Sequence, residues 1–366
     1  MNRTWLCDEV AVPTPYAREA WPSHSNRGSI TSRKNSGAVL RRKAQLKSGR
    51  TAEARTRRSD HVSPMTIRSA GTVSADSGNA ISIASSPIIT ERATVDGVVI
   101  RYARAPHSSG VAVLLTSPWP ESLFAYLPIW EILNRNFSLL AIDLPGFGRS
   151  EGRADLMSPR AMGQFVVRVA DQFGLDRPHI IAPDVGTPSM LFAASEHPDR
   201  FRSLVVGSGA STFPLQVADI LKDIIDAPTL GPYQALDPAD GVENATAQIR
   251  NYAMPGFVRD DYVASYAGAR FVESMAFVRK YIVELPLLAD RLEHIDTPVQ
   301  IIAGRRDPEV LILDAELLHQ RLPNSELAVL DCGHAAWEEA SGEYADVATA
   351  WIGGGYSSRG SGGMQL

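Results

Sequence analysis

From residue 88 onward, short apolar runs alternate with stretches whose apolar residues recur at helical spacing. The continuous apolar runs predict buried strands over 111–115, 138–144, 179–182, 203–206, 299–303 and 327–330. The stretches with helical spacing predict helices over 119–134, 158–173 and 335–351. Because buried strands and helices take turns, the pattern indicates an α/β protein with a mostly parallel sheet, covered by helices on both faces.

Local signals refine two of these elements. Residues 88–95 and 98–102 flank an Asp-Gly pair at 96–97, which is typical of the primed turn in a β-hairpin. The Ser-Pro pair at 158–159 is a typical helix start, because Ser caps the helix and Pro fits its first turn. The sequence therefore predicts a hairpin ahead of the parallel strands and a capped helix over 158–173.

One long region breaks the alternation. Residues 211–296 contain helical stretches such as 215–225 and 259–282 but no convincing strand. An insertion of this length after a sheet strand should lie over the carboxyl ends of the strands, where open α/β sheets bind their ligands. We therefore predict a helical cap over 211–296, inserted between the core segments 86–210 and 297–352.

Both ends of the chain have the composition of disordered segments. Residues 1–85 are rich in Ser, Arg and Gly without sustained periodicity, and residues 353–366 are rich in Gly and Ser. Basic runs at 41–43 and 55–58 leave a nucleic-acid patch or an organelle-targeting segment as alternatives to a solvated tail. Translation from Met65 is another alternative, since nothing upstream of it predicts structure.

Charge and cysteine content restrict the partners and the compartment. Residues 1–86 contain 14 Lys and Arg against 6 Asp and Glu, yet the whole chain has a net charge of −5, so the remainder is acidic. An acidic body does not suit nucleic acid, and no apolar run approaches the roughly 18 residues of a membrane span. The two cysteines, Cys7 and Cys332, make no disulfide framework, and residues 1–9 lack the apolar core of a secretory signal. We expect a cytoplasmic protein whose oligomeric state the sequence leaves open.

The segment Ala-Pro-Asp-Val-Gly at 182–186 points most directly to chemistry. An apolar strand ends here and a helix begins at once, with small residues two before and two after Asp184, which is the pattern of a nucleophile elbow. A carboxylate is already an anion and can displace a leaving group from saturated carbon to form an ester that water hydrolyses. A serine in the same role would leave an ether. Capping of the next helix by Asp184 is the structural alternative.

Four motifs in the same order resemble the α/β-hydrolase fold family over roughly residues 86–352. They are the turn segment 141–150, the elbow 182–186, the strand with an acid at 301–308 and the strand with a histidine at 330–334. The resemblance implies an α/β-hydrolase fold with a helical cap. An Asp at the elbow is similar to epoxide hydrolases and haloalkane dehalogenases, and it implies a hydrolase without a cofactor.

The same resemblance implies a role for each triad position. Asp184 is the nucleophile, His334 takes a proton from the water that attacks the ester, and Asp307 holds the imidazole. The structural alternatives are a packed histidine at 334 and an ordinary turn residue at 307. Glu309 is a spare acid, whereas Asp143 matches a structural turn residue of the family and lies outside the expected site.

Charge stabilisation is expected from the backbone N–H groups of Val185 and Trp119. The usual His-Gly-x-Pro of the family is Ser-Pro-Trp-Pro here, at 117–120, and it keeps the N–H of Trp119. Haloalkane dehalogenases commonly carry a Trp directly after the nucleophile, where this chain has Val185. The indole N–H of Trp119 is a candidate for holding a leaving halide instead, with simple aromatic packing as the alternative.

An epoxide oxygen needs an acid, which the resemblance assigns to tyrosines of the cap. The cap offers Tyr233, Tyr252, Tyr262, Tyr266 and Tyr281, although tyrosines at helical spacing are often core residues. Tyr252 and Tyr266 are our first choices, because both lie in the middle of the cap segment.

These features predict a hydrolase that acts through an alkyl ester on Asp184. The expected substrates are a small, largely apolar epoxide and water. A haloalkane dehalogenase with the same triad and a non-catalytic ligand-binding member of the fold are the alternatives. Ester and carbon–carbon bond hydrolases of this fold use Ser, and Ser189 lies inside the helix, too far along to replace Asp184.

Removing residues 1–85 should leave the fold intact, because this segment lacks the apolar surface needed to offset its ordering entropy. Limited proteolysis should cut there first and leave a stable core. Thermal melting of the full and shortened chains provides the comparison. A fall in Tm of more than about 5 °C on deletion would show that the segment packs on the core.

Overall fold

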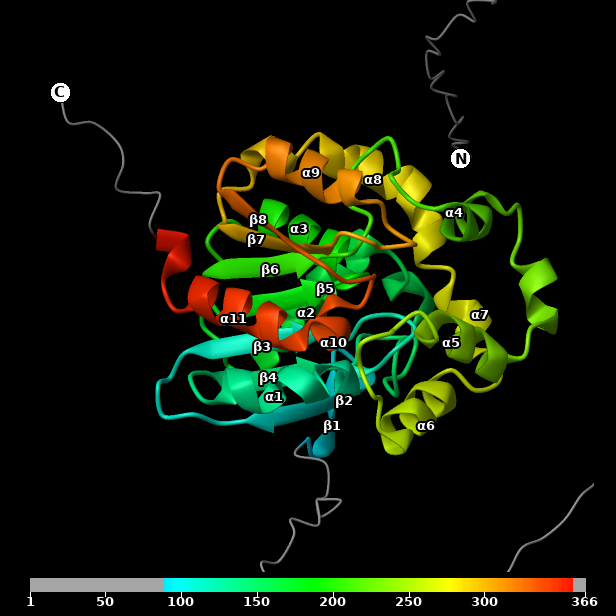
Figure 1. Cartoon of the computed structure of the whole chain (residues 1–366), viewed down its shortest axis with the longest axis horizontal. Helices are drawn as coiled ribbons and strands as arrows, with labels where there is room; N and C mark the ends of the chain where they lie inside the picture. Colours follow the sequence, from blue (N-terminus) through cyan, green and yellow to red (C-terminus); the bar gives the residue numbers. More distant parts are fainter. Residues whose placement is uncertain (1–87, 358–366) are drawn as a thin grey trace, which may run out of the picture. The chain divides into compact units, whose positions relative to one another are not determined.

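The computed structural model describes residues 88–357 (Figure 1), so the expectations for residues 1–85 and for most of 353–366 lie outside the described residues. Eight strands form one sheet in the order β1-β2-β4-β3-β5-β6-β7-β8. β1 pairs with β2 and β2 with β4 in antiparallel fashion, and the other neighbours are parallel. The strands are β1 (Thr90–Val95), β2 (Val98–Ala105), β3 (Ala112–Thr116), β4 (Ser138–Ile142), β5 (His179–Pro183), β6 (Ser203–Gly207), β7 (Val299–Gly304) and β8 (Ser325–Leu330).

The predicted hairpin and the predicted parallel strands are confirmed. Asp96 and Gly97 have φ angles of 48° and 77°, the left-handed conformations that a primed turn requires. This turn pairs Val95 with Val98 and so sets the register of β1 on β2. The mostly parallel sheet follows from the buried apolar runs, as expected.

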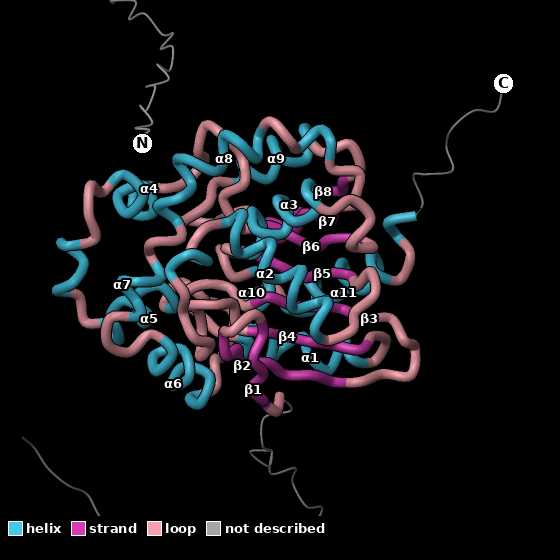
Figure 2. Tube along the Cα trace, turned by 180° about the vertical axis from the view of Figure 1, so that it is seen from behind, coloured by secondary structure: helices cyan, strands magenta, loops and turns pink. Residues whose placement is uncertain are grey.

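Helices cover both faces of the sheet (Figures 1 and 2). α1 (Leu127–Asn134) packs with α10 (Ala336–Glu339) and α11 (Ser341–Ile352). A second group of helices that pack together consists of α2 (Pro159–Gln172), α3 (Gly186–Glu196) and α8 (Tyr281–Ala289). α9 (Ile312–Arg321) packs on β7 and β8. Ser158 accepts a hydrogen bond from the N–H of Ala161 and caps α2, as predicted. The expected helix over 335–351 is interrupted at Ala340, and the one over 119–134 begins only at Leu123, as a 3-10 turn.

The cap lies at the carboxyl ends of the strands, on the right of Figure 1. It contains α4 (Asp219–Asp226), α5 (Pro238–Thr246), α6 (Gly256–Ser265) and α7 (Arg270–Ser274). α8, which the sequence assigned to the cap segment 211–296, packs against α2 and α3 of the core instead. Its apolar residues Leu285 and Leu288 are buried, which is why this end of the insertion joins the core layer.

The described chain extends beyond the expected boundary at residue 352. Gly355–Ser357 forms a short 3-10 helix. The ring of Tyr356 lies 6.3 Å from that of Trp351 and 5.5 Å from that of His179, so packing against the core orders this segment. Between residues 88 and 357, no helix is both long and apolar enough to cross a bilayer.

A buried ionic cluster fastens the cap to the core. Arg101 of β2 donates to Asp143 at 2.5 Å and makes two 2.8 Å hydrogen bonds to Asp261 of α6. Asp261 also accepts from Arg149 at 2.8 Å, and Asp143 accepts from the backbone N–H of Leu123. Asp143 is therefore a structural residue, as its motif suggested.

Replacing Asp261 with Ala should destabilise the protein by about 3 kcal/mol, because two arginines lose their buried partner. Urea unfolding at neutral pH measures the change. Asp260→Ala is the matched control, since Asp260 is exposed on the same helix. Equal stabilities of the two variants would contradict the anchoring role of Asp261.

Candidate active site

The turn between β5 and α3 places Asp184 in a backbone conformation that few residues adopt. Its φ is 53°, and its N–H donates to the carbonyl of Gly207 at 2.9 Å. The turn requires small neighbours: a Cβ on Gly186 would lie 2.5 Å from Thr116 Oγ1, and one on Gly209 would lie 2.0 Å from the carbonyl oxygen of Asp184. α3 begins without a side-chain cap, so Asp184 is not a capping residue.

The carboxylate of Asp184 is 8% exposed, and its two oxygens have different surroundings. Oδ2 accepts the backbone N–H of Trp119 at 2.6 Å, whereas Oδ1 lies 3.8 Å from Nε2 of His334. The N–H of Val185 makes no hydrogen bond among the described residues. One carboxylate oxygen is thus fixed, and the other is free to react.

The indole of Trp119 is turned to the cap. Its N–H donates to Ser274 Oγ at 2.7 Å, and its ring stacks on that of Phe271 with centroids 5.9 Å apart. This arrangement matches the packing alternative and leaves no indole N–H free for a halide. The backbone N–H of Trp119 is the group that meets Asp184.

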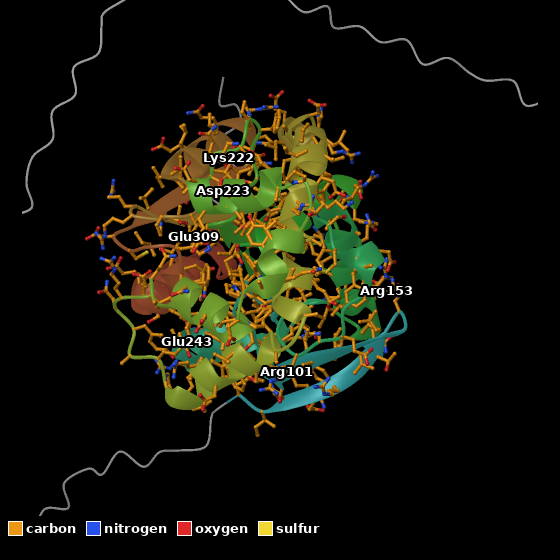
Figure 3. The ribbon with its side chains drawn as sticks, turned by 90° about the vertical axis from the view of Figure 1, so that its right-hand side faces the viewer. Arg101, Arg153, Lys222, Asp223, Glu243 and Glu309 are labelled. Atoms are coloured by element: carbon orange, nitrogen blue, oxygen red, sulfur yellow. The ribbon has the colours of Figure 1, made fainter. Side chains whose placement is uncertain are left out.

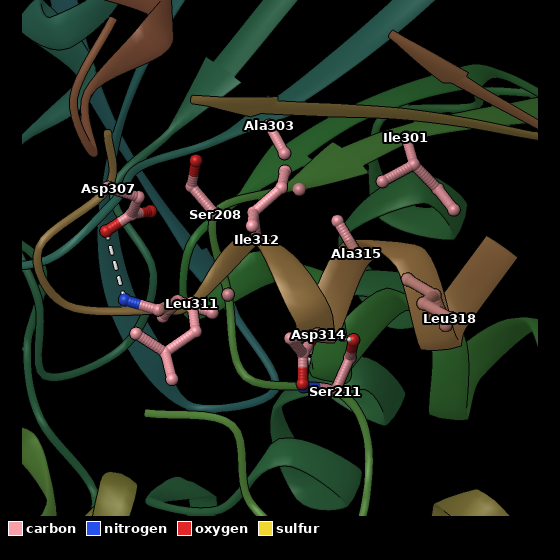
Figure 4. A pocket seen from close by; sticks show the side chains of 13 residues that line it. Ser208, Ser211, Ile301, Ala303, Asp307, Leu311, Ile312, Asp314, Ala315 and Leu318 are labelled. Atoms are coloured by element: carbon pink, nitrogen blue, oxygen red, sulfur yellow. Dashed lines mark hydrogen bonds between the residues drawn. The ribbon is translucent and has the colours of Figure 1, made fainter. Parts of the chain in front are cut away.

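The structure brings His334 and Asp307 together with Asp184. Nδ1 of His334 donates to Asp307 Oδ2 at 2.9 Å, and Asp307 Oδ1 accepts the N–H groups of Glu309 and Val310 at 2.8 and 3.0 Å. Figure 4 shows this carboxylate held by the loop after β7. Burial works against the charged imidazole, but the carboxylates of Asp307, Glu309 and Asp184 outweigh it and raise the pKa of His334 well above its usual value.

Glu309 faces the same imidazole nitrogen from the other side. Its Oε2 lies 3.9 Å from His334 Nε2, and its Oε1 accepts the amide of Gln248 from the cap at 3.2 Å. Burial raises the pKa of Glu309, which the negative charges of Asp184 and Asp307 raise further. The sequence identified Glu309 only as a spare for Asp307, whereas the structure places it beside the imidazole nitrogen that also faces Asp184.

Two neighbouring cavities both have Trp119, Gln248 and Glu309 in their linings, and Asp184 lines neither of them. The larger one, of about 580 Å³, lies mainly among cap residues such as Leu221, Ile224 and Phe271, and Trp119 and Glu309 border it from the core. In Figure 3, Glu309 is seen between Asp223 and Glu243 on the face that carries the cap. A second, closed cavity touches His334, Glu309 and Glu121 and has room for about one water molecule. The larger space suits a small organic molecule.

Two buried carboxyl groups lie next to the triad. Glu121 accepts the indole N–H of Trp337 at 2.9 Å, and Glu338 accepts the hydroxyl of Tyr262 at 3.0 Å. Glu338 Oε2 has no hydrogen-bond partner in the described structure. Burial raises the pKa of Glu121 to about 8 and that of Glu338 well above its usual value. The sequence analysis missed this pair, although Glu121 directly follows the predicted oxyanion loop.

The two first-choice tyrosines have different surroundings. The hydroxyl of Tyr266 donates to the Glu121 carbonyl at 2.9 Å and accepts the N–H of Gly148 at 3.2 Å, so it is fully used. Tyr252 is half-buried, and burial followed by the charges of Glu338 and Glu121 raises its pKa. Neither tyrosine borders the large cavity, whereas Tyr233 does. The fold of α6 onto the core turns Tyr266 into an anchor.

A family model for the alpha/beta hydrolase fold matches residues 119–341 of this sequence. The chain belongs to the α/β-hydrolase family. In this hydrolase, no group of three or more His, Cys, Asp or Glu residues within 88–357 is arranged to hold a metal ion.

Curated relatives and solved structures resemble the chain at low identity. The 2-hydroxy-6-oxononadienedioate/2-hydroxy-6-oxononatrienedioate hydrolase of Paraburkholderia phymatum is 28% identical over 231 residues, which cover 59% of this chain and 76% of that protein. The crystal structure of Cfl2 from Burkholderia cenocepacia has a TM-score of 0.64 at 18% identity, covering 72% of this chain and 95% of that one. Epoxide hydrolase VrEH1 from Vigna radiata has a TM-score of 0.61 at 17% identity, covering 73% and 98%. The two structures agree with this hydrolase in fold.

The buried pair should make stability depend on pH. Between the ordinary glutamate pKa of 4.5 and about 8, folded Glu121 keeps a proton that the unfolded chain loses, so the free energy of unfolding should fall as pH rises through this window. The pKa of His334 is also raised by folding, so His334 stabilises the protein at low pH. This stabilisation is lost as pH rises through the folded pKa of His334, and it therefore adds to the same decline.

Glu121→Gln should flatten this decline, because the amide carries no titrating proton. Urea unfolding between pH 5 and 9 provides the measurement, with exposed Glu316→Gln as the matched control. An unchanged pH slope in Glu121→Gln would contradict a neutral, buried Glu121.

Proposed function

We propose that this α/β hydrolase opens a small, largely apolar epoxide through an alkyl ester on Asp184. The observation that carries the proposal is the carboxylate at the elbow, with Oδ2 held by the N–H of Trp119 and Oδ1 unbonded. An unbonded carboxylate oxygen attacks saturated carbon without losing a proton first. The fixed oxygen becomes the carbonyl oxygen of the ester, already beside a hydrogen-bond donor.

Ester hydrolysis is assigned to His334 and Asp307. Formation of the ester removes the negative charge of Asp184, which is one of the groups that raise the pKa of His334, and so favours the neutral imidazole that accepts a proton. We assign the attacking water to the small cavity that His334 and Glu309 border, from which it gives a proton to Nε2 as its oxygen attacks the ester carbonyl carbon. Asp307 fixes the other ring nitrogen at 2.9 Å and stabilises the imidazolium that forms. The imidazolium then protonates the departing product oxygen.

The rival reactions each meet a specific obstacle. A haloalkane uses the same triad, but the indole N–H of Trp119 is bound to Ser274. The relative from Paraburkholderia phymatum is named a 2-hydroxy-6-oxononadienedioate hydrolase, and a serine mechanism for such a substrate needs a hydroxyl near the elbow. Ser189, the first serine after Asp184 along the chain, donates its hydroxyl to the Val185 carbonyl inside α3. A non-catalytic binder would not need the triad contacts.

His334→Gln should trap the ester, because attack by Asp184 needs no base whereas hydrolysis does. Intact-protein mass spectrometry after mixing with a panel of epoxides and haloalkanes should show an added mass on Asp184 by peptide mapping. An epoxide adds its whole mass, and a haloalkane adds its mass less the hydrogen halide.

Asp184→Asn in the same His334→Gln background is the control and should take up no mass. The single variant Asp184→Ala should lose at least about 10³-fold in kcat while staying folded. Consumption of a substrate by His334→Gln at the wild-type rate without any adduct would rule out the assigned base, and an adduct on another residue would rule out the nucleophile.

A further inference from the structure

Resting on the proposed function, we infer that Glu309 is the general acid that protonates the epoxide oxygen as Asp184 attacks. Glu309 borders the large cavity together with Trp119 and Phe271, so a substrate that extends from this cavity toward His334 would meet it. Among the described residues, Glu309 and Asp184 both stand within 4 Å of His334 Nε2, at 3.9 and 3.8 Å. The nucleophile and the acid thus flank the same point of the site.

The surroundings of Glu309 favour its protonated form. Burial is the largest influence that raises its pKa, and the carboxylates of Asp184 and Asp307 act in the same direction against the opposing charge of His334. Its Oε1 accepts the amide of Gln248, which leaves Oε2 to carry the proton. The charged or titratable groups that face Glu309 or share its cavities are His334, Asp184, Asp307, Glu121, Glu339, Asp223, Tyr233, Asp237 and Asp240.

The cap tyrosines leave this role open. Tyr266 and Tyr262 have hydroxyl groups bound to Glu121 and Glu338, respectively. Tyr281 is buried, and neither Tyr281 nor Tyr252 borders the large cavity. Tyr233 borders the cavity, and it is the rival acid that an experiment must separate from Glu309.

The proton balance closes with these residues. A lone pair of Asp184 Oδ1 forms the bond to an epoxide carbon, the ring C–O bond breaks with its electrons on oxygen, and that oxygen takes the proton of Glu309. Water then gives one proton to His334 as its oxygen bonds to the ester carbon, and the alkyl oxygen leaves with that proton. Asp184 is left as a carboxylic acid, and its proton returns through His334 Nε2 to Glu309, because that nitrogen lies between the two carboxyl groups.

Glu309→Gln should slow epoxide-dependent alkylation of Asp184 by at least about 100-fold, because an amide of the same shape cannot give up a proton to the oxygen. The rate of mass gain is measured in the His334→Gln background, so that ester hydrolysis does not intervene. Glu316→Gln, the same change at an exposed site on α9, should leave the rate unchanged. Activated haloalkanes should alkylate both variants at similar rates, because halide leaves without a proton.

The pH dependence of the alkylation rate shows whether Glu309 acts as an acid or only positions other groups. In the His334→Gln background, the alkylation rate by an epoxide should fall as pH rises through the pKa of Glu309, and Glu309→Gln should remove this alkaline limb. Glu309→Asp should keep the limb with a lower rate, because its carboxyl is shorter by one methylene.

Each other outcome has a distinct meaning. If His334→Gln gains no mass from any compound, the proposed function itself fails. If His334→Gln gains mass from epoxides at the same rate whether or not it also carries Glu309→Gln, only the assignment of the acid is overturned. Loss of the alkaline limb in Tyr233→Phe but not in Glu309→Gln overturns it in favour of the tyrosine, and alkylation by haloalkanes alone overturns it because no acid is then required.

Discussion

The turn at Asp184 is the constraint on which the site depends. A left-handed φ of 53° on a non-glycine residue is costly, and it persists because Gly186 and Gly209 let neighbouring chain approach to distances that a Cβ would forbid. The turn lifts the carboxylate clear of α3 and toward the N–H of Trp119. A side chain that would ordinarily cap a helix is therefore available for chemistry.

The second determinant is the concentration of carboxyl groups around one imidazole. Asp307 binds Nδ1 of His334, while Asp184 and Glu309 approach Nε2. Three negative charges in a buried space repel each other, so the site favours states in which His334 is charged or Glu309 is neutral. A pathway that moves protons between these groups needs little movement of atoms.

The cap is held on the core by polar contacts from α6 and α7. Asp261 ties α6 to Arg101, and Tyr266 ties it to the backbone at Gly148 and Glu121. These contacts use polar groups that would otherwise be candidates for catalysis. α7 closes the other side, where Ser274 binds the Trp119 indole and Phe271 stacks on it. The large cavity is bordered by apolar residues such as Leu221, Ile224 and Met275 and by the acidic residues Asp223, Asp237, Asp240 and Glu309.

The sequence by itself determined the sheet, the elbow and the order of Asp184, Asp307 and His334, because each rests on a local pattern or on a short motif at a strand end. The tertiary structure decided which groups join them. Glu309, Glu121 and Glu338 come from segments that lie far apart in the sequence. Glu121, for example, accepts a hydrogen bond from Trp337, which is 216 positions further along the chain. The surroundings of Tyr252 and Tyr266 likewise depend on how the cap packs on the core. Periodicity reports burial but not the partner of a buried polar group, and that partner decides whether the group anchors the fold or reacts.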